Sequence, residues 1–170
     1  MKIKNHLLLF GVSILLLCSF SMDVGYYGGY GSTPKLMLRS DFEQAIKTLS
    51  VKELDKTSRI NIKGNMIYIV ELYRGVHVID NADPSQPKTI HFINIPGCVD
   101  MSIKGNQLFA RSAEDLVAID ISDISDVKEI SRLRETFPEI ENGDEYYSLP
   151  YRFSKGQRPA NTVIVAWEKK

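Results

Sequence analysis

The sequence predicts a mainly β fold: a propeller-like repeat of four-stranded antiparallel blades, with two complete units, the start of a third and one short N-terminal helix. Two observations support this. A repeat of about 40 residues is typical either of helical arrays or of propeller blades. Within it, runs of about five β-branched and aromatic residues end at Gly, Asn, Asp or Pro, a pattern that favours strands over helices.

The repeat is visible in two pairs of matching stretches. The triplet KGN at residues 63–65 recurs at 104–106, an offset of 41 residues. GVHVIDNADPSQPK, residues 75–88, matches DLVAIDISDISDVK, residues 115–128, at an offset of 40. Two independent matches with nearly the same offset indicate a true repeat, with one residue lost around 73–75.

Each unit divides into four expected strands. The KGN triplets supply the tight turn between the first and second strands, because Gly and Asn tolerate positive φ. A blade cannot bury both faces alone, so packing between neighbouring blades is expected to form the core. The expected strands are residues 60–63, 66–70, 76–80 and 89–93 in the first unit and 99–104, 108–111, 117–121 and 129–133 in the second.

Residues 1–21 have the layout of a secretory signal peptide. Lys2 and Lys4 precede an apolar run over residues 7–17, as in signal sequences. The run is shorter than the roughly 20 residues that a membrane-spanning helix needs. Residues 22–38, rich in Gly and Tyr, are expected to form a flexible tether.

Cys18 is the candidate lipidation residue. It stands where a lipoprotein carries its lipid-modified cysteine, although the preceding Leu17 is larger than the usual residue there. Cleavage after Ser19 or Ser21 by ordinary signal peptidase is the alternative. Both routes predict an exported protein of the bacterial cell envelope. Acylation of Cys18 would anchor the protein in a membrane by its lipid, and the outer membrane is one such location.

Residues 39–58 are expected to form a short amphipathic helix and a connection. Ser40 and Glu43 have the spacing of a capping box. The apolar positions on one helical face are Phe42, Ile46 and Leu49. This stripe predicts packing against the sheet that follows.

Residues 59–170 form the expected repeat domain, with units at about 59–98 and 99–133. An acidic insertion follows at 134–160, and 161–170 resemble the second strand of a unit beginning again. Propellers need at least about four blades. The sequence therefore leads us to expect a fragment, a truncated product, or a short form that pairs with another chain.

The stretches YIVELYRGVHVIDNADPSQP, FINIPGCVDMSIKGNQLFARSAEDLVAIDIS and RLRETFPEI closely resemble bacterial proteins with LVIVD repeats. The counterparts of the strand motif that names this family are VHVID and LVAID. The resemblance covers about residues 34–170. It implies an exported, often lipid-anchored protein with a β-propeller-like fold and no shared catalytic residues; members generally run to more than twice this length.

Residues with catalytic or metal-binding chemistry do not fall at the spacings that known sites require. Basic and acidic residues balance at 21 each, which argues against a nucleic-acid partner. His77 and His91 lie in expected strands without a partner at metal-ligand spacing. Cys98 stands in an apolar run and is expected to be a small buried hydrophobe.

Aspartates pair up across the repeat, Asp80 with Asp120 and Asp83 with Asp123. Their spacing of three residues could suggest calcium, but calcium needs about six to eight oxygen ligands, and these loops lack the Asp/Gly pattern of calcium-binding loops. The favoured interpretation is that they end strands and open turns by accepting local backbone N–H bonds.

The loop ENGDEYY, residues 141–147, has two possible interpretations. It could present acidic and aromatic groups to a ligand such as a glycan, or it could be a solvated insertion loop, and the second interpretation is favoured.

The function expected is a non-enzymatic envelope scaffold whose loops or blade edges bind a protein or glycan partner, without catalytic, cofactor or metal residues. The alternative is a fragment of an exported enzyme with its active site in missing blades or around Asp144 and Glu145.

Overall fold

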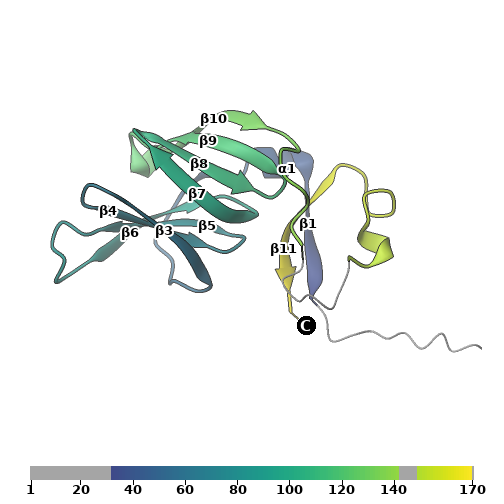
Figure 1. The fold of residues 1–170 in the computed structure, drawn as a ribbon, viewed down its shortest axis with the longest axis horizontal. Coiled ribbons are helices and arrows are strands. Elements are labelled where there is room, and N and C mark those ends of the chain that lie inside the picture. Colours follow the sequence, from purple (N-terminus) through teal and green to yellow (C-terminus); the bar gives the residue numbers. More distant parts are fainter. Residues whose placement is uncertain (1–31, 142–148, 170) are drawn as a thin grey trace, which may run out of the picture.

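The computed structural model describes residues 32–141 and 149–169. They form antiparallel sheets with one short α-helix, and this confirms the predicted mainly β fold (Figure 1). The predicted signal peptide and Cys18 lie outside the described residues. No helix in the described part of the chain has the length and apolar character that a bilayer crossing requires.

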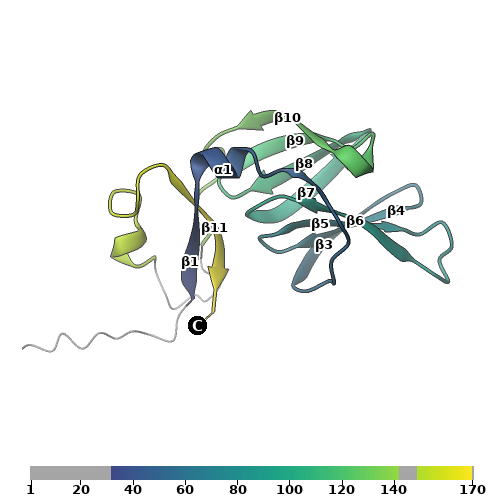
Figure 2. The same cartoon turned by 180° about the vertical axis from the view of Figure 1, so that it is seen from behind.

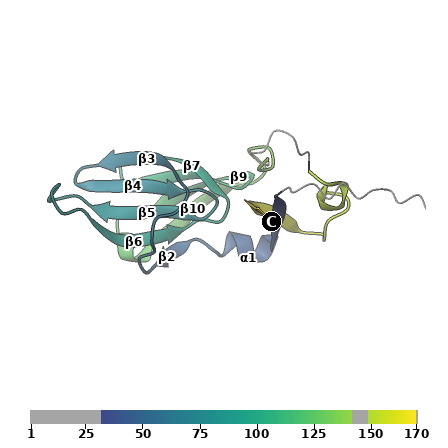
Figure 3. The same cartoon turned by 90° about the horizontal axis from the view of Figure 1, so that it is seen from below.

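The first repeat forms an antiparallel sheet, which we call blade 1. Its four consecutive strands lie side by side in chain order, and a short strand β2 (Lys47–Leu49) adds to the outer edge beside β6 (Figure 3). The four strands are β3 (Thr57–Lys63), β4 (Met66–Glu71), β5 (Gly75–Asp80) and β6 (Lys88–Asn94).

The second repeat forms an equivalent four-stranded sheet, blade 2, which packs face to face on blade 1 (Figure 1). Its strands are β7 (Cys98–Lys104), β8 (Gln107–Ser112), β9 (Asp115–Asp120) and β10 (Lys128–Leu133), with a 3₁₀ turn η1 (Ile124–Asp126) between the last two. All eight predicted blade strands are therefore confirmed, with their ends shifted by a few residues.

The turns account for the two repeat offsets. Gly64 and Gly105 both have φ of +57°, as the predicted tight turns require. The β4–β5 turn has three residues, 72–74, whereas the β8–β9 turn has two, 113–114. The residue lost between the two halves of the repeat is therefore a turn residue, and the strands keep their register.

The predicted helix is shorter than its apolar stripe suggested. Helix α1 (Arg39–Glu43) has five residues, and its N-cap Leu38 makes no side-chain capping bond, so the capping box expected of Ser40 and Glu43 does not form. Lys47–Leu49 is strand β2 instead of helix, because pairing with β6 and the 2.8 Å bond from Thr48 Oγ1 to the Ile124 carbonyl satisfy its polar groups. A helix of about ten residues is only marginally stable on its own, so the pairing with β6 prevails over it.

The tether prediction is wrong over its last residues. Thr33–Leu38 forms β1, which pairs antiparallel with β11 (Thr162–Glu168) in a two-stranded sheet beside the blades. Figure 2 shows β1 leading directly into α1. The expected third-unit segment is thus a strand, and its partner comes from the opposite end of the described chain. The insertion contains a 3₁₀ turn, η2 (Tyr151–Phe153).

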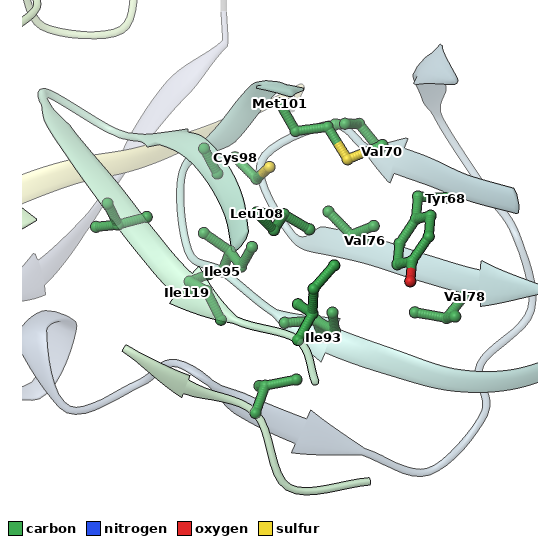
Figure 4. Close-up of a cluster of buried hydrophobic side chains, with 14 residues drawn as sticks. Tyr68, Val70, Val76, Val78, Ile93, Ile95, Cys98, Met101, Leu108 and Ile119 are labelled. Carbon is green, nitrogen blue, oxygen red and sulfur yellow. The ribbon is translucent and has the colours of Figure 1, made fainter. Parts of the chain in front are cut away.

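The main core lies between the two blades (Figure 4). Blade 1 contributes alternate residues of β4 and β5, and blade 2 contributes alternate residues of β7, β8 and β9, as expected where one face of each strand is buried. The principal residues are Tyr68, Val70, Val76 and Val78 on one side and Met101, Leu108, Ala110, Val117 and Ile119 on the other. A second cluster around Phe42, Val163 and Val165 joins α1 to the β1–β11 sheet.

Candidate functional site

A groove of about 570 Å³ lies where the β4–β5 turn approaches the β1–β11 sheet. Tyr73 and Arg74 line it from the turn, Trp167 from β11, Asn94 from the end of β6 and Pro96 from the link between the blades. It is built from segments far apart in the chain, joined by the pairing of β1 with β11. We call it the junction groove.

Hydrogen bonds fix the backbone of one aromatic residue of the junction groove and the side chain of another. Tyr73, at φ +68°, donates its N–H to the Cys98 carbonyl at 2.6 Å and accepts from the Gly97 N–H at 2.9 Å. Trp167 donates from Nε1 to the Ile140 carbonyl at 2.8 Å. Burial raises the pKa of Tyr73 above its ordinary value of 10.0, and the protonated hydroxyl can donate a hydrogen bond.

The rim of the junction groove carries charges of both signs. Lys35 pairs with Glu168 across the β1–β11 sheet at 3.4 Å, and Arg74 Nη1 lies 2.5 Å from Glu71 Oε1. The first pair is exposed and contributes little to stability. Fixed aromatic surfaces among a few polar groups are typical of small-ligand sites.

Glu71 and His77 form a buried carboxylate–imidazole pair beside the groove. His77 Nε2 lies 2.6 Å from Glu71 Oε2, and both side chains are fully buried. The Phe92 ring packs edge-on against His77 with centroids 4.8 Å apart. Glu71 lines the groove, but His77 lies behind it, so the imidazole has no surface on which to contact a substrate.

Burial keeps His77 away from any ligand in the junction groove. General acid–base work requires the titrating group within hydrogen-bond reach of the substrate. In the described part of the chain, no three His, Cys, Asp or Glu side chains are grouped so as to hold a metal. Glu71 and His77 are best explained as a buried polar pair that fixes the β4–β5 hairpin and thereby the position of Tyr73.

A second polar cluster fastens α1 to blade 2. Asp115 is fully buried, and its Oδ2 accepts from Arg39 Nη1 at 2.7 Å and from Arg132 Nη1 at 2.9 Å. Its Oδ1 accepts the Glu135 N–H at 3.0 Å. The Phe42 ring lies 5.5 Å from the Arg39 guanidinium carbon and 4.9 Å from that of Arg132. We call this set the arginine–aspartate cluster; its carboxylate is occupied on all sides and has a structural role.

The four repeated aspartates act as turn residues, as the sequence predicts. Asp80 Oδ1 accepts the Ala82 N–H at 2.9 Å, and Asp120 Oδ1 accepts the Ser122 N–H at the same distance. Asp83 and Asp123 make the equivalent bonds with the Ser85 and Ser125 N–H groups at 3.0 and 2.9 Å. Each carboxylate thus closes a local turn.

These bonds predict a pH dependence. Hydrogen bonds from the Ser122 hydroxyl and N–H lower the pKa of Asp120 below its ordinary 3.8. A lowered folded-state pKa stabilises the fold above pH 4, and this contribution is lost as pH falls through the folded value. We expect the carboxyl carbon of Asp120 to titrate by NMR with a midpoint below 3.8, and Ser122→Ala to move it upward. Equal midpoints in both proteins would contradict the assignment.

Other residues considered from the sequence lie apart from the groove's chemistry. Cys98 is fully buried, and burial raises the pKa of its thiol to about 12, so it is not a nucleophile at neutral pH. His91 is half-buried on β6. Asp144 and Glu145, and most of the 141–147 loop, lie outside the described residues.

Comparison with protein families gives two matches to the LVIVD repeat, over residues 55–93 and 98–134. The chain contains two LVIVD repeats. Each LVIVD match covers one blade, and the strands VHVID and LVAID of the motif are β5 and β9, the third strand of each blade. Comparison with curated proteins and with solved structures returned no match.

The residues of the junction groove were not predicted. Glu71 could have been noticed as a charge ending an apolar run, with His77 opposite it once the hairpin was drawn. Tyr73 and Trp167 carry no local signal of proximity, since they meet only through the β1–β11 sheet. The LVIVD repeat itself places β4 and β5, but not β11.

Proposed function

We propose that this LVIVD-repeat protein is a non-enzymatic binding scaffold of the cell envelope, and that the junction groove binds a glycan of the envelope. The observation that carries the proposal is a pair of aromatic residues in one groove: Tyr73, whose backbone is fixed by two hydrogen bonds, and Trp167, whose indole N–H bonds to the Ile140 carbonyl. Rigid aromatic side chains bind ligands at low conformational cost. Neighbouring polar side chains can orient the ligand's hydroxyl groups.

The N-terminal sequence supports placement in the envelope. Lys2, Lys4 and the apolar run that follows have the layout of an export signal, and Cys18 is the candidate lipid-anchored residue. We expect acyl labelling of the protein in cells to disappear in Cys18→Ser. Labelling that persists in this variant would exclude Cys18 as the anchor without touching the binding proposal.

The sole tryptophan of the chain reports directly on the groove. Since Trp167 lines it, titration with envelope oligosaccharides should change the intrinsic tryptophan fluorescence. We expect Tyr73→Ala to weaken binding about tenfold, which corresponds to about 1.4 kcal/mol, within the range of one aromatic contact. Circular dichroism would verify that the variant is folded.

The matched control is Tyr151→Ala. Tyr151 is 76% exposed in η2 and does not line the groove, so its replacement should leave binding unchanged. If the junction groove bound peptides and no oligosaccharide, the proposal of a glycan ligand would be wrong. Substrate turnover that is lost in Asp144→Ala or Glu145→Ala would overturn the non-enzymatic assignment.

A further inference from the structure

The two blades pack through unlike faces. Blade 1 presents the face that carries Tyr68, Val70, Val76 and Val78, which we call the front face. Blade 2 receives it with its opposite side, the back face, which carries Met101, Leu108, Ala110, Val117 and Ile119. An interface of two different surfaces on repeated units can be repeated indefinitely or closed into a ring.

The repeat shows which surfaces are left over. Applying the offsets of 41 and 40 residues to the front face of blade 1 gives the front face of blade 2: Phe109, Arg111, Leu116 and Ala118. All four are half-buried. The same offsets carry the buried back face of blade 2 onto a back face of blade 1, made of Ile60, Ile67, Ile69, His77 and Ile79, with Ile62 matching Ile103.

The back face of blade 1 is apolar and largely open at its inner edge. Ile60 and Ile62 on β3 are 59% and 69% exposed, and Ile67, Ile69 and Ile79 beside them are half-buried. Cross-strand pairing aligns Ile60 with Ile69 and Ile62 with Ile67. The outer part, at Phe92, is covered by Lys52, whose Nζ lies 4.7 Å from the ring centroid. Figure 3 shows blade 1 from the side away from blade 2.

Polar contacts between the inner strands follow the same symmetry. Arg59 on β3 pairs with Asp100 on β7 at 2.9 Å, and these are equivalent positions of the two repeats. Lys63 Nζ donates to Asn106 Oδ1 at 2.8 Å. Repeating the interface once more would place Asp100 beside Arg59 of a second copy. It would likewise place Lys104 beside Asn65 of that copy.

We propose that the front face of blade 2 binds the back face of blade 1 of a second copy, so that chains join head to tail. The partner for the back face of blade 1 is inferred from the interface between the two blades of one chain. The hydrophobic pattern and the polar pairs of that interface both recur on the two surfaces that would meet. Since propellers have about four to eight blades, closure would take about two to four copies. Arg111, in the place of Val70, bonds to the Pro138 carbonyl at 2.8 Å and lies over the Phe137 ring, so the segment after β10 covers part of the front face of blade 2 and this interface is smaller and more polar than the internal one. We therefore expect reversible association.

Sedimentation velocity across a concentration series tests the association. We expect the wild-type protein to form a closed oligomer as its concentration rises, and Ile62→Glu to raise the dissociation constant at least about tenfold, because it buries a charge in the interface. The side chain is exposed in the single chain, so folding should be preserved. Leu38→Glu, at an equally apolar site 52% exposed in β1, is the control and should associate like wild type.

Cross-linking distinguishes this interface from unspecific aggregation. In a Cys18→Ser background, Asn65→Cys protein mixed with Lys104→Cys protein should give mixed dimers with a short bismaleimide. Lys63→Cys mixed with Asn106→Cys should give few, because these two positions already meet within one chain. A monomer at every concentration, insensitivity to Ile62→Glu, or equal cross-linking of both mixtures would each overturn the proposal.

Discussion

Gly75→Ala is expected to destabilise blade 1 strongly. Gly75 begins β5 at φ +149°, and a β-carbon there would lie 2.0 Å from the Ile93 carbonyl oxygen and 2.9 Å from the Ile95 nitrogen. Both obstacles are backbone atoms of the β6 region, so no side-chain rotation can relieve them. We expect a loss of more than about 4 kcal/mol in the free energy of unfolding, a large part of the 5–15 kcal/mol that holds a typical domain.

Two other glycines separate the clash from backbone strain. Gly64 has φ of +57° but open space around the β-carbon position, so Gly64→Ala should cost only the left-handed conformation, about 1–2 kcal/mol. Gly156 has neither constraint, and Gly156→Ala should lie within about 0.5 kcal/mol of wild type. Urea unfolding followed by circular dichroism measures all three. A Gly75→Ala protein as stable as Gly64→Ala would contradict the predicted clash.

Asp115→Ala is expected to cost roughly 3 kcal/mol, because it removes a fully buried carboxylate that two arginines share, leaving Arg132 with Glu129 and Arg39 with Glu114 as their remaining partners. Arg132, 8% exposed, and Arg39, 21% exposed, both bond to the Asp115 carboxylate. The Glu135 N–H loses its acceptor as well. The unfolding midpoint in urea should fall while the slope of the transition stays close to wild type.

Asp100→Ala is the matched control for Asp115. Asp100 also pairs with an arginine, Arg59, but the two side chains are 51% and 61% exposed. Exposed pairs contribute about 0–1 kcal/mol. Equal losses in the free energy of unfolding for Asp115→Ala and Asp100→Ala would show that burial does not strengthen the arginine–aspartate cluster.

The blades could be predicted from the sequence because their information is local. The KGN turns, the alternation along VHVID and LVAID, and the aspartates that end these strands all act within a few residues. Even the uneven repeat offset has a local cause, the extra residue at 72–74. Repetition then made each local signal visible twice.

The N-terminal elements could not be predicted because tertiary pairing decides them. Helical spacing links Phe42, Ile46 and Leu49 in the sequence, yet only Phe42 lies in α1. Leu49 lies in β2, where it pairs with Phe92 of β6. Residues 33–38 follow a Gly/Tyr-rich stretch that suggests no strand, and they become one through β11. Propensity is a weak prior where a distant partner supplies the hydrogen bonds.

The pairing of β1 with β11 has a consequence for the order of folding. Thr33 faces Glu168, so this sheet joins the most widely separated strands of the described chain, whereas every blade strand pairs with one close in sequence. Long-range pairings carry the largest loop-closure entropy, and contacts of this kind slow folding. The blades should therefore form first and the junction groove last. Its appearance, reported by Trp167, would mark the end of folding.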